Sequence, residues 1–116
     1  MNQTDFERYT KYLLSKSADL LITKGSEYAG SEDRLANFKR GATATGVPQA
    51  TVAFIYLTKH LDSVASHLRD PSRTLSEPIE GRLCDLLNYV ILLAAILHEE
   101  KCRGAIPAAF VRPEEA

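Results

Sequence analysis

The chain has 116 residues, of which 45% are hydrophobic, and its 14 basic and 15 acidic side chains leave a formal net charge of -1. This length predicts one domain, which we place at residues 1–104, followed by a loosely packed tail at residues 105–116. The apolar content is sufficient for a core and argues against a disordered chain. The balanced charge argues against a broad basic surface for duplex nucleic acid, so we expect no such partner.

Neither a membrane nor a secretory route is indicated. The N-terminus has no apolar signal segment, and the longest apolar run, Leu83 to Leu97, is too short and too polar at its edges to span a bilayer. Cys84 and Cys102 lie 18 residues apart on one predicted helix, too far for a disulfide, and they match no zinc motif. We therefore expect a soluble, cytoplasmic protein in which Cys84 is a core residue.

The first helix is predicted to run from Thr4, which has capping-box spacing with Glu7, to a C-cap at Gly25. A loop rich in glycine and serine should follow, and a short second helix should begin between Ser31 and Asp33. This second segment is dense in groups able to recognise a ligand: Glu27, Tyr28, Asp33, Arg34, Asn37 and Lys39. A solvated loop with a charged short helix would have the same composition.

A connector from Thr43 to Pro48 precedes the third helix, which is predicted to run from Pro48 to about Arg69. One apolar stripe at helical spacing is expected to enter the core: Ala53, Leu57, Leu61, Val64 and Leu68. A second stripe at the same spacing is polar or aromatic: Tyr56, His60, Ser63 and His67. Lys59 and Asp62 flank this second stripe.

The last helix is predicted over Ser76 to Cys102, with Ser76 or Glu77 as its cap and Pro78 in its first turn. Its expected apolar face consists of Leu83, Leu86, Leu87, Val90, Leu93, Ala94 and Leu97. The sequence thus predicts an all-α helical bundle of three long helices and one short helix. Long amphipathic helices carry more apolar surface than one small chain can cover, so we expect a homo-oligomer.

Paired polar residues at the start of the last helix suggest two kinds of site. Glu77 and Glu80, and then Asp85 and Asn88, repeat a three-residue spacing that places oxygen ligands on one helical face, as at Mg²⁺ sites. The first pair is more readily explained by the preference of acidic residues for helix N-termini. Asp85 and Asn88 interrupt an apolar helix, so they need either a ligand or an ion pair. The candidate cations for that pair are Arg34, Lys59 and Arg82.

Motifs for nucleophilic catalysis or a phosphate loop are absent from the sequence, which has no GxSxG, P-loop or GxGxxG. His60 and His67 are seven residues apart, which is not the spacing of a helical zinc pair, although His60 is a candidate ligand contact. Phosphate recognition would therefore use cationic side chains: Lys24, Arg34, Lys39, Lys59 and Arg82. The rings able to stack on a base are Tyr28, Phe38, Tyr56 and Tyr89. Core packing explains Phe38 and Tyr89 equally well.

Three blocks of the sequence resemble a known family. KGSEYAGSEDRLANFK, LTKHLDSV and EPIEGRLCDLLNYVILL, in this order and spacing, are similar to the small all-α phage and prophage proteins called nucleotide modification associated domain 1. The resemblance spans about Lys24 to Leu97. It implies a link with phage nucleotide metabolism and, for a phage-encoded chain, a location in the host cytoplasm. It does not imply a reaction.

The last block also resembles the final metal-binding helix of the MazG-like all-α nucleoside triphosphate pyrophosphatases. Those enzymes hold Mg²⁺ with an ExxE pair on one helix and an ExxD pair on the next. Asp85 stands where the final aspartate would be, but Arg82 replaces the preceding glutamate, and the preceding helix offers Lys59 and Asp62. These positive charges would repel Mg²⁺ and attract phosphate, which argues against pyrophosphohydrolysis by that mechanism.

The sequence therefore predicts a protein that binds a nucleotide or nucleotide-derived molecule between helices, at an oligomer interface, and sequesters it as a signal of a host defence system. We expect no catalytic residue, resident metal or cofactor. The expected ligand-binding residues are Lys24, Tyr28, Arg34, Asn37, Phe38, Lys39, Lys59, His60, Arg82, Asp85 and Asn88. Two alternatives stay open. One is a structural helical interaction module, and the other is a Mg²⁺-dependent nucleotide pyrophosphohydrolase that uses Glu77, Glu80, Asp85 and Asp62.

Overall fold

The structure is a computed structural model that describes residues 1–28 and 33–102, without the side chains of residues 25–28 and 102. Four helices follow one another: α1 (Gln3–Tyr28), α2 (Ala36–Thr45), α3 (Gln49–Arg69) and α4 (Ile79–Cys102). The predicted all-α architecture of three long helices and one short helix is confirmed, and the described residues contain no strand. The predicted tail and the end of the predicted loop after α1 lie outside this part of the chain.

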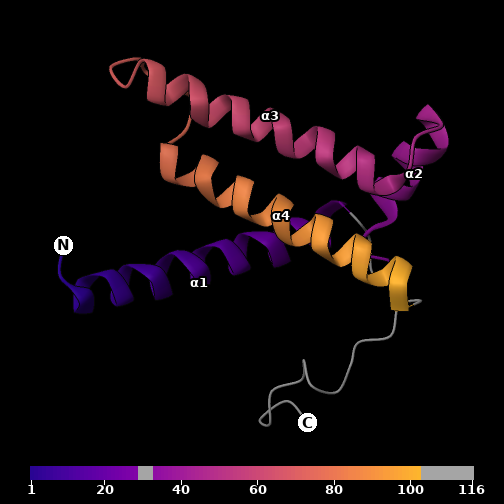
Figure 1. Cartoon of the computed structure of the whole chain (residues 1–116), viewed down its shortest axis with the longest axis horizontal. Helices are drawn as coiled ribbons and strands as arrows, with labels where there is room; N and C mark the ends of the chain where they lie inside the picture. Colours follow the sequence, from indigo (N-terminus) through magenta and orange to yellow (C-terminus); the bar gives the residue numbers. More distant parts are fainter. Residues whose placement is uncertain (29–32, 103–116) are drawn as a thin grey trace, which may run out of the picture.

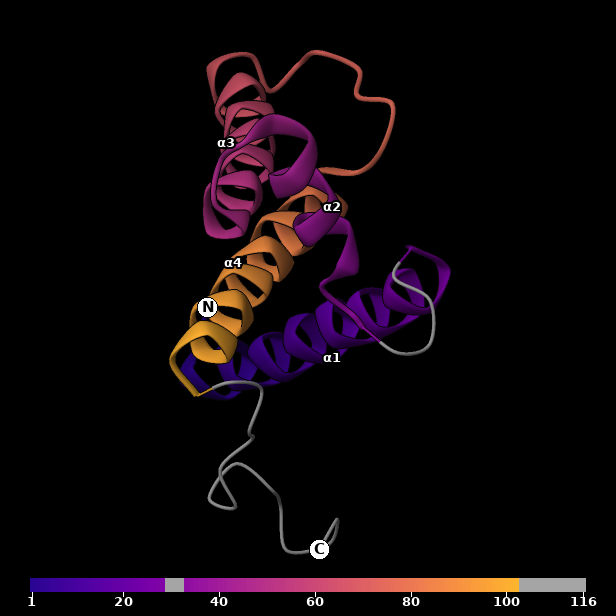
Figure 2. The same ribbon diagram turned by 90° about the vertical axis from the view of Figure 1, so that its right-hand side faces the viewer.

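α4 is the helix on which the others assemble. It runs antiparallel to α3, and α1 packs against another of its sides (Figure 1). Figure 2 shows α4 between α3 and α1, with the short α2 beside α3. Side chains from all four segments therefore meet along α4. Within the described part of the chain, no helix is long and apolar enough to cross a membrane.

α1 is longer than predicted at both ends. Asn2 caps it, because its Oδ1 accepts a hydrogen bond from the Asp5 backbone N–H at 2.8 Å, so the predicted cap at Thr4 is wrong. The predicted end at Gly25 is also wrong, since the helix continues to Tyr28. A glycine inside a helix costs only about 1 kcal/mol relative to alanine.

α2 lies further along the chain than predicted. It begins at Ala36 because Asp33 forms a turn, in which its Oδ1 accepts a hydrogen bond from the Leu35 N–H at 3.0 Å. It ends at Thr45, inside the segment predicted to be a connector. Gly46 then takes a left-handed φ of 78°, and its N–H closes the last turn of the helix. The short helix therefore sits closer to α3 than the sequence suggested.

The other two helices begin close to their predicted positions. α3 covers nearly the predicted range, whereas α4 begins at Ile79, so that Pro78 precedes the helix instead of standing in its first turn. The Pro78 carbonyl accepts the backbone N–H groups of Gly81 and Arg82 at 3.1 and 3.4 Å. Pro78 thus marks the boundary of α4 through its carbonyl and its missing N–H.

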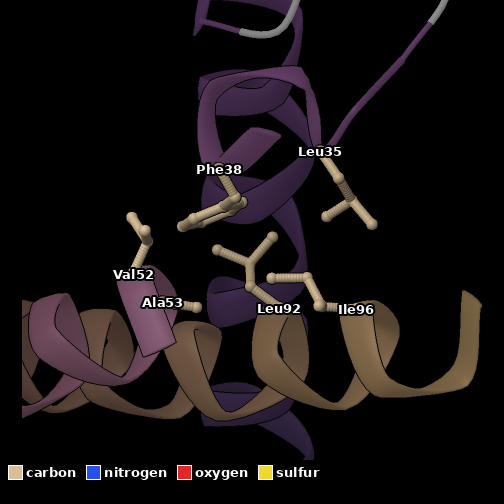
Figure 3. Packing of buried hydrophobic residues seen from close by; sticks show 6 residues of the cluster. All are labelled: Leu35, Phe38, Val52, Ala53, Leu92 and Ile96. Atoms are coloured by element: carbon tan, nitrogen blue, oxygen red, sulfur yellow. The ribbon is translucent and has the colours of Figure 1, made fainter. Parts of the chain in front are cut away.

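The core lies where α2 meets α3 and α4. Its buried side chains point toward one another in Figure 3: Leu35, Phe38, Val52, Ala53, Leu92 and Ile96. Phe38 is 1% exposed, and its ring meets the rings of Tyr56 and Tyr89 edge-on, with centroids 6.4 Å apart in each pair. The core thus joins α2 to the α3–α4 pair, and the aromatic rings border it on one side.

The buried stripe of α4 differs from its predicted apolar face. The buried residues recur at four-residue steps: Cys84, Asn88, Leu92 and Ile96. The burial of Cys84 was predicted, but the predicted burial of Leu83, Val90 and Leu97 is wrong, since these side chains are exposed. α1, α3 and the core side chain Phe38 of α2 cover the four-residue stripe, which leaves the large aliphatic side chains on an open side of the helix.

α3 departs from its prediction in the same way. Ala53 and Val64 are buried as predicted, but Leu61 and Leu68 are exposed, and Phe54 is exposed with them. Seven-residue steps relate the exposed apolar side chains on each of the two helices: Phe54, Leu61 and Leu68 on α3, and Leu83, Val90 and Leu97 on α4. These six side chains are termed the α3–α4 apolar face.

The three side chains on each helix of this face point away from the core. Phe54 follows the buried Val52 by two residues, and Val90 precedes the buried Leu92 by two residues. A two-residue step turns a helical side chain by about 160°. Since Val52 and Leu92 both enter the core under α2, the two stripes share the opposite side of the α3–α4 pair.

Candidate ligand-binding site

A pocket of about 260 Å³ opens where α1, the start of α2, α3 and α4 meet. Seven of the residues expected to bind a ligand line it: Lys24, Arg34, Asn37, Phe38, His60, Asp85 and Asn88. Leu21, Tyr89 and Leu92 complete the lining. Small-molecule sites usually measure roughly 300–1,000 Å³, so this pocket encloses part of a ligand and leaves the rest in solvent.

An ion pair joins α1 to α4 at the edge of the pocket. The Lys24 Nζ lies 2.9 Å from the Asp85 Oδ1, and Asp85 is the more buried of the two side chains. The predicted partners of Asp85, which were Arg34, Lys59 and Arg82, are therefore wrong. Lys24 stands on α1, which packs against α4, and it is 61 residues away from Asp85 in the chain, so no local pattern indicates this pair.

Arg34 is differently placed from Lys24. Within the described residues no carboxylate pairs with it, and its Nη2 donates only a long hydrogen bond, at 3.5 Å, to the Leu21 carbonyl. A guanidinium has five N–H donors, arranged to contact two oxygens of a phosphate or carboxylate at once. Arg34 therefore brings a positive charge with unused donors into the pocket.

Two side-chain amides supply hydrogen-bond acceptors, which complement the donors of Arg34. The Asn88 Nδ2 donates a hydrogen bond to the Ser17 backbone carbonyl at 2.9 Å, and this contact fixes the orientation of the amide. The Asn88 Oδ1 is then left buried without a hydrogen-bond partner, and so is the Asn37 Oδ1. A buried acceptor without a partner costs free energy, so both oxygens favour a ligand or water that offers N–H or O–H groups.

The two amides are expected to differ in their effect on stability. Asn88→Ala should lower the free energy of unfolding by about 0.5–1.5 kcal/mol, because it removes the buried hydrogen bond that joins α4 to the Ser17 carbonyl of α1. Asn37→Ala is the matched control, since its unpaired oxygen contributes no described hydrogen bond to the fold. Urea unfolding followed by circular dichroism measures both. Equal losses in the two variants would contradict this assignment.

One wall of the pocket is aromatic. The His60 ring stacks on the Tyr89 ring, with centroids 4.8 Å apart and planes 25° from parallel, and Phe38 meets Tyr89 edge-on. Burial raises the pKa of Tyr89 above its ordinary value, so its hydroxyl stays protonated and can donate a hydrogen bond. A flat heterocycle can pack against such a wall.

The remaining expected ligand residues do not line this pocket. Lys39 contacts two carboxylates, Asp33 at 2.7 Å and Glu99 at 2.9 Å, and its hydrogen bond lowers the pKa of Asp33. Lys59 is exposed on α3, and Arg82 lines a different cavity. The Tyr28 side chain lies outside the described residues. Two of the predicted phosphate-binding cations, Lys24 and Arg34, therefore line the pocket. The other three lie elsewhere: Lys39, Lys59 and Arg82.

Comparison with protein-family models, with curated proteins and with solved structures finds no match for this chain. The resemblance to the phage nucleotide modification associated proteins stays a prediction based on three blocks of residues.

The carboxylates proposed for Mg²⁺ do not converge. Among the described residues, no group of three or more His, Cys, Asp or Glu side chains is placed to hold a metal ion. Glu80 accepts hydrogen bonds from Lys16 at 2.7 Å and Tyr12 at 2.8 Å, which lower its pKa, and Glu77 lies near Arg82. Asp85 is paired with Lys24. Glu80 and Asp85 thus join α4 to α1 at separate points, and Glu77 lies beside Arg82 before the start of α4.

Sequence reasoning left Leu21, Tyr89 and Leu92 out of the expected ligand set, although it considered Tyr89 as a ring that could stack on a base. Helical spacing relates these residues to the polar residues that were predicted. Tyr89 follows Asp85 by four residues, and Leu92 follows Asn88 by four, so each shares a face with a polar lining residue. Leu21 stands one turn before Lys24 on α1.

Proposed function

We propose that the protein binds a nucleotide or nucleotide-derived small molecule in this pocket and holds it without chemical change. One observation carries the proposal: an arginine without a described acidic partner, two unpaired amide oxygens and an aromatic wall line a single pocket. These groups match the needs of a phosphate, of the amino groups of a base and of its ring.

A protein of this kind removes its ligand from solution. Together with the resemblance to phage proteins, this favours the sequestration, in the host cytoplasm, of a nucleotide signal made by a defence system. The separation of Glu77, Glu80 and Asp85, each near a different cation, weakens the Mg²⁺-dependent hydrolase alternative. One experiment can distinguish nucleotide binding from both alternatives, which are hydrolysis and a purely structural role.

The experiment is a depletion assay on a nucleotide panel. The purified protein is incubated with each nucleotide, with and without Mg²⁺, and is removed by filtration. It is then heat-denatured, and the released material is analysed by chromatography. We expect one nucleotide to be depleted and recovered intact. New products would establish the enzyme alternative, and the absence of depletion across the panel would refute nucleotide binding and favour an interaction module.

We also propose that the protein self-associates through the α3–α4 apolar face. This face carries six exposed apolar side chains, and a second copy of the chain offers an equally apolar surface. The nucleotide pocket lies on the other side of the helix pair, because Leu92 lines it and Val90 points away from Leu92. An assembly built on this face would therefore leave the pockets open to solvent, in contrast to the interface site expected from the sequence.

A further inference from the structure

A second cavity, of about 350 Å³, lies between the C-terminal half of α3, the connector that follows it and the first turns of α4. Its polar lining consists of two arginines and four hydroxyl residues: Arg73, Arg82, Ser63, Ser66, Thr74 and Ser76. Among the described residues no carboxylate lines it, and it shares no lining residue with the nucleotide pocket.

Arg82 is held firmly at this cavity. Its Nη1 donates a hydrogen bond to the Ser63 Oγ, and its Nη2 donates one to the Ser76 Oγ at 3.4 Å. Ser76 and Glu77, which were expected to cap α4, thus lie beside the Arg82 side chain instead. The Glu77 carboxylate is 3.8 Å from the Arg82 Nε, beyond hydrogen-bond reach, and its side chain is largely exposed.

The charge of Arg82 is therefore only weakly compensated. Its side chain is 17% exposed, and its Nε is buried without a hydrogen-bond partner. A largely buried cation whose described ion pair is long and partly exposed to solvent attracts an added anion more strongly than a surface arginine does. Arg73, which is exposed, adds a second guanidinium to the same cavity.

We propose that this cavity binds a phosphate group, independently of the nucleotide pocket. A phosphate presents several acceptor oxygens in a tetrahedral arrangement, and the cavity surrounds its interior with guanidinium and hydroxyl donors. A carboxylate would use fewer of these donors. The group can arrive as inorganic phosphate or as the end of a phosphate monoester, and both share the chemistry that the lining recognises.

The test is titration of the full chain with inorganic phosphate and, separately, with phenyl phosphate. Binding is measured by the broadening of the ³¹P NMR line of each probe. We expect saturable binding of inorganic phosphate, and at least a tenfold weaker affinity in Arg73→Ala. Arg73 is exposed, so this variant should keep the fold, which thermal unfolding verifies. Arg69→Ala is the matched control, because Arg69 is an exposed arginine on the last turn of α3 that does not line the cavity.

The two probes distinguish the sources of the phosphate group. Saturable binding of both, each weakened in Arg73→Ala, assigns the cavity to phosphate groups whether free or esterified, whereas binding of inorganic phosphate alone assigns it to the free anion. The proposal is overturned if neither probe saturates, or if Arg69→Ala weakens binding as much as Arg73→Ala. It is also overturned if Arg34→Ala abolishes phosphate binding and Arg73→Ala does not, since the phosphate would then occupy the nucleotide pocket.

Discussion

Arg34→Ala is expected to weaken binding of the depleted nucleotide roughly 10- to 100-fold, because charge-assisted hydrogen bonds to a phosphate contribute about 1.5–3 kcal/mol. Arg34 is the lining cation without a described carboxylate partner, and only one long hydrogen bond, to the Leu21 carbonyl, engages it in the free protein. Its removal should therefore cost little stability. Isothermal titration calorimetry measures the affinity, and urea unfolding verifies the fold.

Lys59→Ala is the control that separates the geometry from the net charge. The sequence placed Lys59 with Arg34 among the phosphate-binding cations, but the structure places it on the exposed side of α3, outside the pocket. Binding should be unchanged within about twofold, a difference near 0.4 kcal/mol. If Lys59→Ala loses as much affinity as Arg34→Ala, or if Arg34→Ala binds normally, the ligand does not occupy this pocket.

Helical spacing accounts for what the sequence predicted of the site. Arg34, Asn37 and Phe38 lie within about one turn around the start of α2, and Asp85 and Asn88 lie one turn apart on α4, so each group shares a face. Lys39 and Lys59 lie outside the pocket, because Lys39 pairs with Asp33 and Glu99 and Lys59 is exposed on α3. From the sequence, these lysines and Arg34 were equally good candidates for phosphate binding.

Contacts between distant segments account for what the sequence did not predict. α4 carries apolar side chains on more than one face, and the face that is buried depends on where α1, α3 and the core side chains of α2 pack against it. Periodicity favoured Leu83, Val90 and Leu97, whereas the folded chain buries Asn88, which is on the same stripe as Cys84, Leu92 and Ile96. Asn88 becomes acceptable there because the Ser17 carbonyl of α1 accepts its N–H. That partner is 71 residues away in the chain, beyond any local pattern.

The exposed stripes indicate how the proposed self-association would be arranged. His60 stacks on Tyr89, so their chain neighbours Leu61 and Val90, the central members of the two stripes, both lie near the middle of the antiparallel pair. A second copy, turned by a two-fold axis near the centre of the face, would oppose two apolar stripes to two and form a four-helix assembly.

Leu61→Asp is expected to weaken this association at least 100-fold, because a two-fold axis near the centre of the face would bring two aspartates together in an apolar interface. Leu61 is 49% exposed, and burying the remainder of each such side chain contributes on the order of 1 kcal/mol. Twelve side chains in a dimer then give a gain on the order of 10 kcal/mol, enough to offset an association cost of about 4–15 kcal/mol.

Ile55→Asp is the matched control, because Ile55 is 55% exposed on the same helix but lies outside the apolar face. Light scattering at micromolar concentration should show an oligomer for the wild-type protein and for Ile55→Asp, and a monomer for Leu61→Asp. A monomeric wild-type protein, or a Leu61→Asp protein that associates normally, would show that this face is not the interface.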